Sequence, residues 1–287
     1  MTSTLPVELS GFAQIADHYD GMLCDIWGVV HNGVTQHAEA VDALVRFRKG
    51  GGRVVLITNA ARPADNLQAM LDEMGVTEAA YDRVISSGDM TRALIEPYRG
   101  GIVHHVGPPS NLPMFEGTGV NFGSAEQAQA VVVTGLDGDA ETPDDYLARM
   151  ALWRAQGLVL VCANPDKVVE RGDRLVYCPG ALADIYEADG GKVVQAGKPH
   201  APIYTRALSM LADAGGPTDL SRILAVGDSA RTDATGAGEM GLDLLFITGS
   251  IHAAEFSGDG GTAGEKVQAL IAPTGARLAG YMDQLRW

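Results

Sequence analysis

The chain is poor in cysteine, with three in 287 residues. None of them has the C-x-x-C spacing of a zinc or redox motif, and a disulfide framework needs a higher density of cysteines. The sequence therefore indicates neither a zinc site nor a disulfide-stabilised fold, and it fits a reducing compartment. The three residues are Cys24, Cys162 and Cys178.

Long apolar runs and positive charge are also scarce. No stretch approaches the roughly 18 uncharged apolar residues of a membrane span, and the segment MTSTLPVELSGF is not a leader pattern. We therefore expect a cytoplasmic protein. Lysine and arginine number 21 against 36 acidic residues, a formal net charge of −15. This balance disfavours nucleic acid and anionic membranes as partners, although a phosphate could still bind locally.

Short apolar runs alternate with amphipathic helical stretches, which is typical of a parallel α/β architecture. For example, Leu67, Met70, Leu71 and Met74 form one helical stripe that ends at Gly75. At about 150 residues per domain, the length predicts either one large domain or two of medium size. The predicted strands are residues 21–24, 54–57, 84–86, 102–106, 131–134, 158–162, 223–226 and 244–247.

Two glycine pairs, Gly100-Gly101 and Gly190-Gly191, lie in polar contexts between periodic segments. They predict that residues 99–190 form a smaller α/β domain inserted into a core domain of residues 1–98 plus 191–287. The alternative is that both pairs are ordinary loops within one large sheet.

Polar residues that follow predicted strands are candidates for chemistry, because parallel sheets bind ligands at the carboxyl ends of their strands. Asp25 could act as a nucleophile or bind a cation, and Thr58 could hold an anion near a helix start. Lys198 precedes another helix, and Asp228 and Asp233 are oxygen ligands that suit magnesium. Taken singly, each has a simpler interpretation as a helix cap, a strand-end hydroxyl or a solvated charge.

The order of these residues resembles the motif series of the haloacid dehalogenase superfamily, and within it the NagD-like class IIA hydrolases. Segments similar to that class are Ile57-Thr58-Asn59, Ser86-Ser87-Gly88, Ala163-Asn164-Pro165-Asp166 and Gly197-Lys198-Pro199. The resemblance covers nearly the whole chain. It implies a Rossmann-like parallel core with an inserted α/β cap domain.

The resemblance also implies roles for individual residues. Asp25 would attack phosphorus to form an aspartyl-phosphate and would ligate Mg²⁺. Asp228 would be the second carboxylate ligand and the backbone carbonyl of Trp27 a third, with Asp233 as a nearby orienting group. The implied enzyme is a Mg²⁺-dependent phosphatase.

Substrate binding is assigned in the same way. Thr58, Asn59 and Lys198 would bind the small phosphorylated substrate, and Lys198 would also offset negative charge. We expect no nucleic-acid or membrane partner, given the net charge, and the resemblance allows a homodimer. Arg62 could reach a substrate phosphate, although a surface arginine is an equal alternative. Sugar phosphates, nucleotides and cofactor phosphates all stay open as substrates.

One position departs from the family pattern. The phosphatases usually carry D-x-D in the first motif, and their second aspartate is a general acid/base that is typically worth about 10²–10⁴-fold in rate. Here that position is Trp27. Three hypotheses follow: slow hydrolysis of substrates with good leaving groups, a substitute acid/base for which His31 is the nearest candidate, or loss of phosphatase activity. The simpler interpretation of His31 is an exposed turn residue.

Two rival functions use the same residues. A dehalogenase would also employ Asp25 and would tolerate loss of the second aspartate, but it would not explain Asp228, Asp233 and Lys198 together. A catalytically weakened phosphate-binding or regulatory protein would explain Trp27.

Overall fold

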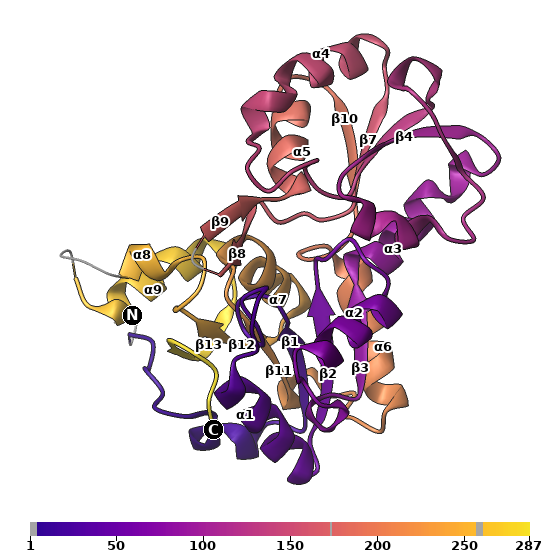
Figure 1. Cartoon of the computed structure of the whole chain (residues 1–287). Coiled ribbons are helices and arrows are strands. Elements are labelled where there is room, and N and C mark those ends of the chain that lie inside the picture. Colours follow the sequence, from indigo (N-terminus) through magenta and orange to yellow (C-terminus); the bar gives the residue numbers. More distant parts are fainter. Residues whose placement is uncertain (1–4, 173, 257–260) are drawn as a thin grey trace.

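The computed structural model describes residues 5–172, 174–256 and 261–287. Its largest sheet has six strands, all parallel, in the order β13-β12-β11-β1-β2-β3 (Figure 1). The predicted α/β fold with a parallel sheet is therefore confirmed. The strands of this first sheet are β1 (Gly21–Asp25), β2 (Arg53–Thr58), β3 (Arg83–Ser86), β11 (Ile223–Gly227), β12 (Asp243–Ile247) and β13 (Arg277–Met282).

A second parallel sheet has the order β10-β7-β6-β4-β5, and a separate antiparallel hairpin pairs β8 with β9. All of these strands lie between β3 and β11 in the sequence, so the chain leaves the first sheet and later returns to it. The bounds are β4 (Ile102–Val106), β5 (Asn121–Phe122), β6 (Ala130–Val133), β7 (Val159–Cys162), β8 (Val168–Arg171), β9 (Arg174–Tyr177) and β10 (Lys192–Gln195).

The second glycine pair does not end the second sheet, because β10 lies beyond it and pairs with β7. Gly190 has φ +86° and follows the C-terminus of a helix, where glycine readily adopts a left-handed conformation. The pair is therefore the turn between that helix and β10. We propose a core domain and an inserted domain, with the return to the core placed after Gln195 instead of near residue 190.

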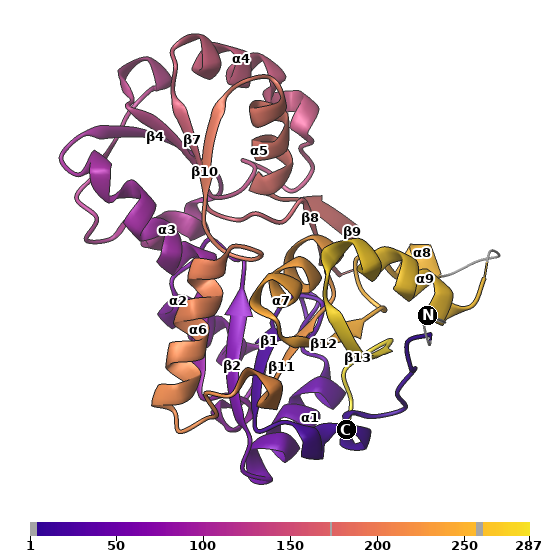
Figure 2. The ribbon, with the colours of Figure 1, turned by 180° about the vertical axis from the view of Figure 1, so that it is seen from behind.

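Helices cover both faces of the first sheet, as the two opposite views show (Figure 1, Figure 2). Side chains of β1 alternate between the faces: Met22 and Cys24 pack with Leu44 of α1, whereas Leu23 packs with Leu211 of α6. The helices are α1 (Ala38–Lys49), α2 (Ala64–Glu73), α3 (Ser87–Ile95), α4 (Leu147–Ala155), α5 (Pro179–Ala188), α6 (Ala201–Asp213), α7 (Thr235–Met240), α8 (Ala253–Phe256) and α9 (Ala263–Ile271).

All eight predicted apolar runs form strands. The sequence missed five others, β5, β8, β9, β10 and β13, because they are short or carry polar and glycine residues that weaken the apolar pattern. The three cysteines are free and buried. Within the described ranges, no helix has the length and apolar character needed to cross a membrane.

Candidate active site

The predicted site residues meet at the carboxyl edge of the first sheet. Asp25 and Thr58 end β1 and β2, and Asp228 directly follows β11. These three residues and Trp27 line one cavity of about 20 Å³. Parallel pairing brings the strand ends together, so the site follows from the topology. The remaining lining residues are Asp166, Val168, Val169, Ser229 and Ile251.

Three carboxylates and one ammonium form the charged centre of this edge. Carboxylate oxygens of Asp25, Asp228 and Asp233 all lie within 4.8 Å of one another. Lys198 enters from the connection after β10, and its Nζ lies 2.6 Å from Asp25 Oδ1 and 2.7 Å from Asp233 Oδ1. All four side chains are buried. The lysine therefore bridges two of the carboxylates.

The negative charges are not balanced by protein groups alone. Ionised, the four groups carry +1 − 3 = −2. Burial, and then the neighbouring Asp233 charge, raises the pKa of Asp25 well above its usual range and that of Asp228 to about 7. A divalent cation would offset this repulsion, and an all-oxygen donor set suits Mg²⁺. The residues present therefore fit that ion.

Two glycines permit this close approach. Gly28 has φ +84°, and a Cβ there would overlap the Asp228 carboxylate. A Cβ at Gly227 would overlap the Asp233 side chain in the same way. The turn after β1 and the last residue of β11 thus need glycine for the carboxylates to converge.

Thr58 and Asn59 have different places in the site. Thr58 is 3% exposed and lines the cavity. Asn59 does not line it: its Nδ2 donates to Asp166 Oδ1 at 2.9 Å, and its Oδ1 accepts from Lys198 N at 2.7 Å. Because these partners hold its amide, Asn59 positions the Lys198 backbone. The expectation that Asn59 binds substrate is not supported by this geometry.

Trp27 faces the inserted part of the chain. Its side chain lines the cavity, and its indole N–H donates to the carbonyl of Glu170 in the β8–β9 hairpin. The hairpin is also held by Gly172 N, which donates to Asn32 O at 3.0 Å, and by Ser250 Oγ, which donates to Glu170 Oε2 at 3.3 Å. The hairpin therefore covers the site (Figure 1).

His31 is not the exposed turn residue that the sequence favoured, since its side chain is fully buried. Its Nδ1 accepts from Gly33 N at 2.9 Å, and its ring meets the Trp27 ring edge-on at 5.0 Å. Burial, with a contribution from His37, lowers the pKa of His31 to about 4. It is absent from the described lining of the Asp25 cavity. The geometry thus disfavours His31 as the acid/base.

Asp166 is a site residue to which the sequence assigned no role. It lines the cavity with Asp25 and accepts a hydrogen bond from Asn59, and burial raises its pKa. The signal was present, because the segment Ala163–Asp166 matched the class. Only the fold showed that this segment, from the end of β7, reaches the first sheet.

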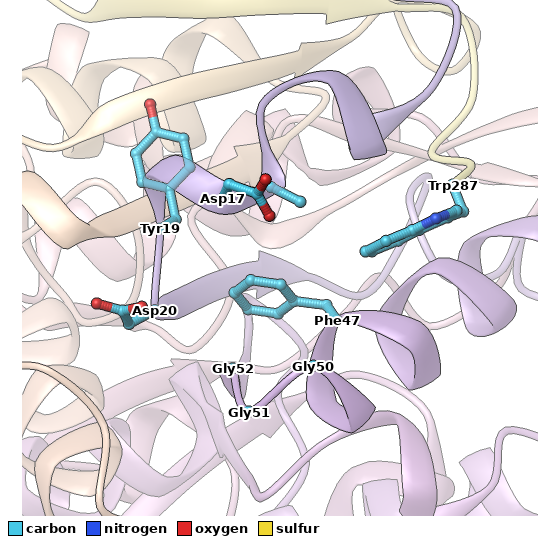
Figure 3. Close-up of a pocket in the computed structure, with 9 residues that line it drawn as sticks. Asp17, Tyr19, Asp20, Phe47, Gly50, Gly51, Gly52 and Trp287 are labelled. Carbon is cyan, nitrogen blue, oxygen red and sulfur yellow. The ribbon is translucent and has the colours of Figure 1, made fainter.

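A larger cavity, of about 570 Å³, lies at the opposite edge of the first sheet (Figure 3). Asp20, Gly52 and Trp287 line it, and the first two immediately precede β1 and β2. None of the predicted site residues is among its described lining.

Two family models and several curated proteins match this chain. The family model "Haloacid dehalogenase-like hydrolase" matches residues 22–121, and a second model, "HAD-hydrolase-like", matches residues 195–267. Among curated proteins, D-glycerol 3-phosphate phosphatase of Mycobacterium tuberculosis is 29% identical over 84% of this chain. The match spans 66% of that enzyme's length. The 5′-nucleotidase YutF of Bacillus subtilis is 24% identical over 80% of this chain and 87% of its own.

Solved structures match over most of the chain. A haloacid dehalogenase-like hydrolase from Brucella suis is 42% identical, with a TM-score of 0.84, over 98% of this chain and 100% of its own. The mycobacterial glycerol phosphate phosphatase in complex with magnesium is 29% identical, with a TM-score of 0.60, over 81% of this chain and 69% of its own. The chain therefore belongs to the haloacid dehalogenase-like family of hydrolases, as its motif order indicated.

Proposed function

We propose that this hydrolase is a Mg²⁺-dependent phosphatase that acts on a small phosphate monoester through Asp25. The observation that carries the proposal is the buried group of three carboxylates around Lys198. A phosphatase needs a nucleophile, a metal site and a cation for the phosphoryl oxygens in one place. The phosphatases among the relatives support the same chemistry.

The carboxylates of Asp25 and Asp228 and the backbone carbonyl of Trp27 would hold the metal ion. When bound, Mg²⁺ supplies positive charge that stabilises the transferring phosphoryl group. Asp233 holds Lys198 in place: its Oδ1 accepts from Lys198 Nζ, and its Oδ2 accepts from Ser229 N at 3.1 Å. Asp233 is therefore assigned to positioning.

Two displacements at phosphorus complete the reaction. A carboxylate oxygen of Asp25 bonds to phosphorus while the P–O bond of the ester breaks, and the leaving oxygen departs with the electron pair and takes a proton from solvent water. Water then attacks the phosphorus of the aspartyl-phosphate and gives up a proton to solvent, the bond to Asp25 breaks with its electron pair returning to the carboxylate, and inorganic phosphate leaves. Lys198 and Thr58 bind the phosphoryl oxygens during both displacements.

Trp27 restricts the substrates that this route serves. An indole does not supply a proton to the leaving oxygen, so esters whose leaving group needs no protonation should react faster. The test is phosphate release from 4-nitrophenyl phosphate and from alkyl phosphates, with Mg²⁺ and with EDTA. Hydrolysis that requires Mg²⁺ and favours the aryl ester supports the proposal. Dehalogenation that survives EDTA would replace it.

A second candidate is a protein that accepts or binds phosphate without turnover. Trp27 favours it, because the indole occupies the acid/base position and is fixed by Glu170. This candidate predicts that Asp25 keeps its phosphoryl group after incubation with a phosphate donor. Mass spectrometry of the acid-quenched protein, with Asp25→Asn as the control, would distinguish a stable aspartyl-phosphate from turnover.

A further inference from the structure

A second cavity adjoins the proposed phosphoryl site. Its volume is about 130 Å³, and Trp27 and Val169 line both cavities. One wall comes from the start of α2 and the residues before it, and the other from the inserted part of the chain. Most lining residues are apolar or neutral, among them Leu67, Met70, Pro108, Asn111 and Tyr177. A substrate with its phosphoryl group at Asp25 would place its remaining atoms here.

Arg62 is the only charged residue among the described lining of this cavity. It is half-buried, and its side-chain partners are neutral: Nε donates to Asn111 Oδ1 and Nη2 to Ser110 Oγ, both at 3.0 Å, and Nη1 contacts Met70 Sδ at 3.7 Å. Within the described ranges, no carboxylate lies within 4.0 Å of its guanidinium. By contrast, the nearby Arg171 is paired with Asp139.

An unpaired, partly buried cation is costly unless a ligand or water compensates it. Burial, and then repulsion from Arg171, lowers the pKa of Arg62. A guanidinium has five N–H donors, and the three contacts above leave two for a ligand. This local positive charge stands out in a chain of net charge −15. Such a donor pair matches the two oxygens of an anionic group.

We propose that Arg62 binds a second anionic group of the substrate, so that the preferred substrates are short phosphate monoesters that also carry a carboxylate. Short substrates are favoured because the cavity is small, about 130 Å³. This inference rests on the proposed function for its reaction, but the recognition of the second anion is a separate property of Arg62.

A matched pair of probes tests the inference. 3-Phosphoglycerate and glycerol 3-phosphate differ in a carboxylate and a hydroxymethyl group at the end far from the phosphate. The wild-type enzyme should have a kcat/KM about ten- to a hundred-fold higher for the carboxylate probe, the range of one charge-assisted hydrogen-bonded pair. Arg62→Gln should bring this ratio close to one, and Arg62→Lys should restore it in part.

Arg92→Gln is the matched control. Arg92 also joins the first sheet's helices to the segment after β4 through neutral partners, the carbonyls of Met114 and Glu116, but it does not line the cavity. The ratio should be unchanged in this variant. If Arg92→Gln lowers the ratio as much as Arg62→Gln, Arg62 acts as an interdomain clamp and the inference is wrong.

Binding separates the inference from the proposed reaction. In Asp25→Asn with Mg²⁺, calorimetry should give a tighter Kd for 3-phosphoglycerate than for glycerol 3-phosphate, and Arg62→Gln should remove the difference. Suppose that this difference in Kd is found but the wild-type protein hydrolyses neither probe nor 4-nitrophenyl phosphate. The phosphatase proposal would then be wrong, and the anion site at Arg62 would stand. Equal affinities in the presence of Arg62 would overturn the anion site, whatever the turnover.

Discussion

The two edges of the first sheet carry cavities of very different size and character. The amino edge has the large one, about 570 Å³, with the exposed Asp17 at its rim (Figure 3). At the carboxyl edge, the cavity at Asp25 has only about 20 Å³, but the carboxylate oxygens of Asp25, Asp228 and Asp233 lie within 4.8 Å of one another there, and Lys198 pairs with the first and the last. Strand direction, and not cavity size, therefore marks the reactive edge in this parallel sheet.

Replacing the nucleophile should give the largest effect. Asp25→Asn removes the attacking oxygen's charge while keeping the side-chain shape, so kcat should fall by at least about 10⁴-fold. Asp17→Asn, at the other edge, should leave activity unchanged. Phosphate release from 4-nitrophenyl phosphate measures both. Loss of activity in Asp17→Asn would show that the amino edge takes part in catalysis, and the contrast between the two edges would then be wrong.

Restoring a carboxylate at Trp27 should have the next largest effect. Trp27→Asp supplies the missing acid/base, so kcat for alkyl phosphates should rise by about 10²-fold or more. Trp27→Phe is the control, because it loses only the hydrogen bond to Glu170 and supplies no acid. A rate that rises equally in both variants would mean that release of the hairpin, and not proton transfer, limits turnover.

Mg²⁺ should stabilise the folded protein through the carboxylates at the carboxyl edge of the first sheet. Mg²⁺ binds the folded carboxylate group, so it should raise Tm in a concentration-dependent way. Asp228→Asn should lose most of this shift and, without Mg²⁺, should be more stable than wild type because one of three crowded buried charges is gone. Differential scanning calorimetry gives both values. An unchanged Mg²⁺-dependent shift in Asp228→Asn would place the ion elsewhere.

His31 should give the smallest effect on catalysis and a measurable one on acid stability. Its pKa is about 4 when folded and 6.5 unfolded, so the unfolded chain binds a proton first and His31 costs stability as pH falls from 6.5 towards 4. At pH 5 this cost is about 2 kcal/mol. In His31→Gln, urea unfolding should show a smaller loss between pH 7 and pH 5. The pH profile of kcat should not move, and a moved profile would restore His31 as a candidate acid/base.

Much of the site could be predicted because its residues follow apolar runs. Asp25, Thr58 and Asp228 each end or follow a strand, and a parallel sheet places such positions on one edge. The role of Asn59 could not be predicted in this way. An amide beside a phosphate motif can hydrogen-bond either to the substrate or to the protein. Only the contacts of Asn59 with Lys198 and Asp166 show that it does the second.

Burial and packing explain where the sequence prediction and the structure differ at His31 and at the β8–β9 hairpin. His31 follows a turn, and turns are usually exposed, but packing against Trp27 encloses it. The β8–β9 hairpin has a weak apolar pattern because its side chains are partly exposed, yet its backbone covers the site. The second sheet extends to β10, beyond the second glycine pair. The sequence could not show this, because a glycine turn looks the same whether it joins two elements or two domains.

By itself, the sequence determined the parallel α/β class, the order of the motifs and the family, because apolar periodicity and strand-end chemistry are local properties. The tertiary structure decided which of these groups face one another. It brought Lys198 to Asp25 across more than 170 residues, enclosed His31, turned Asn59 away from the cavity and left Arg62 without a carboxylate partner among the described residues. These are properties of distance and burial, and they are set by packing between elements remote in the chain.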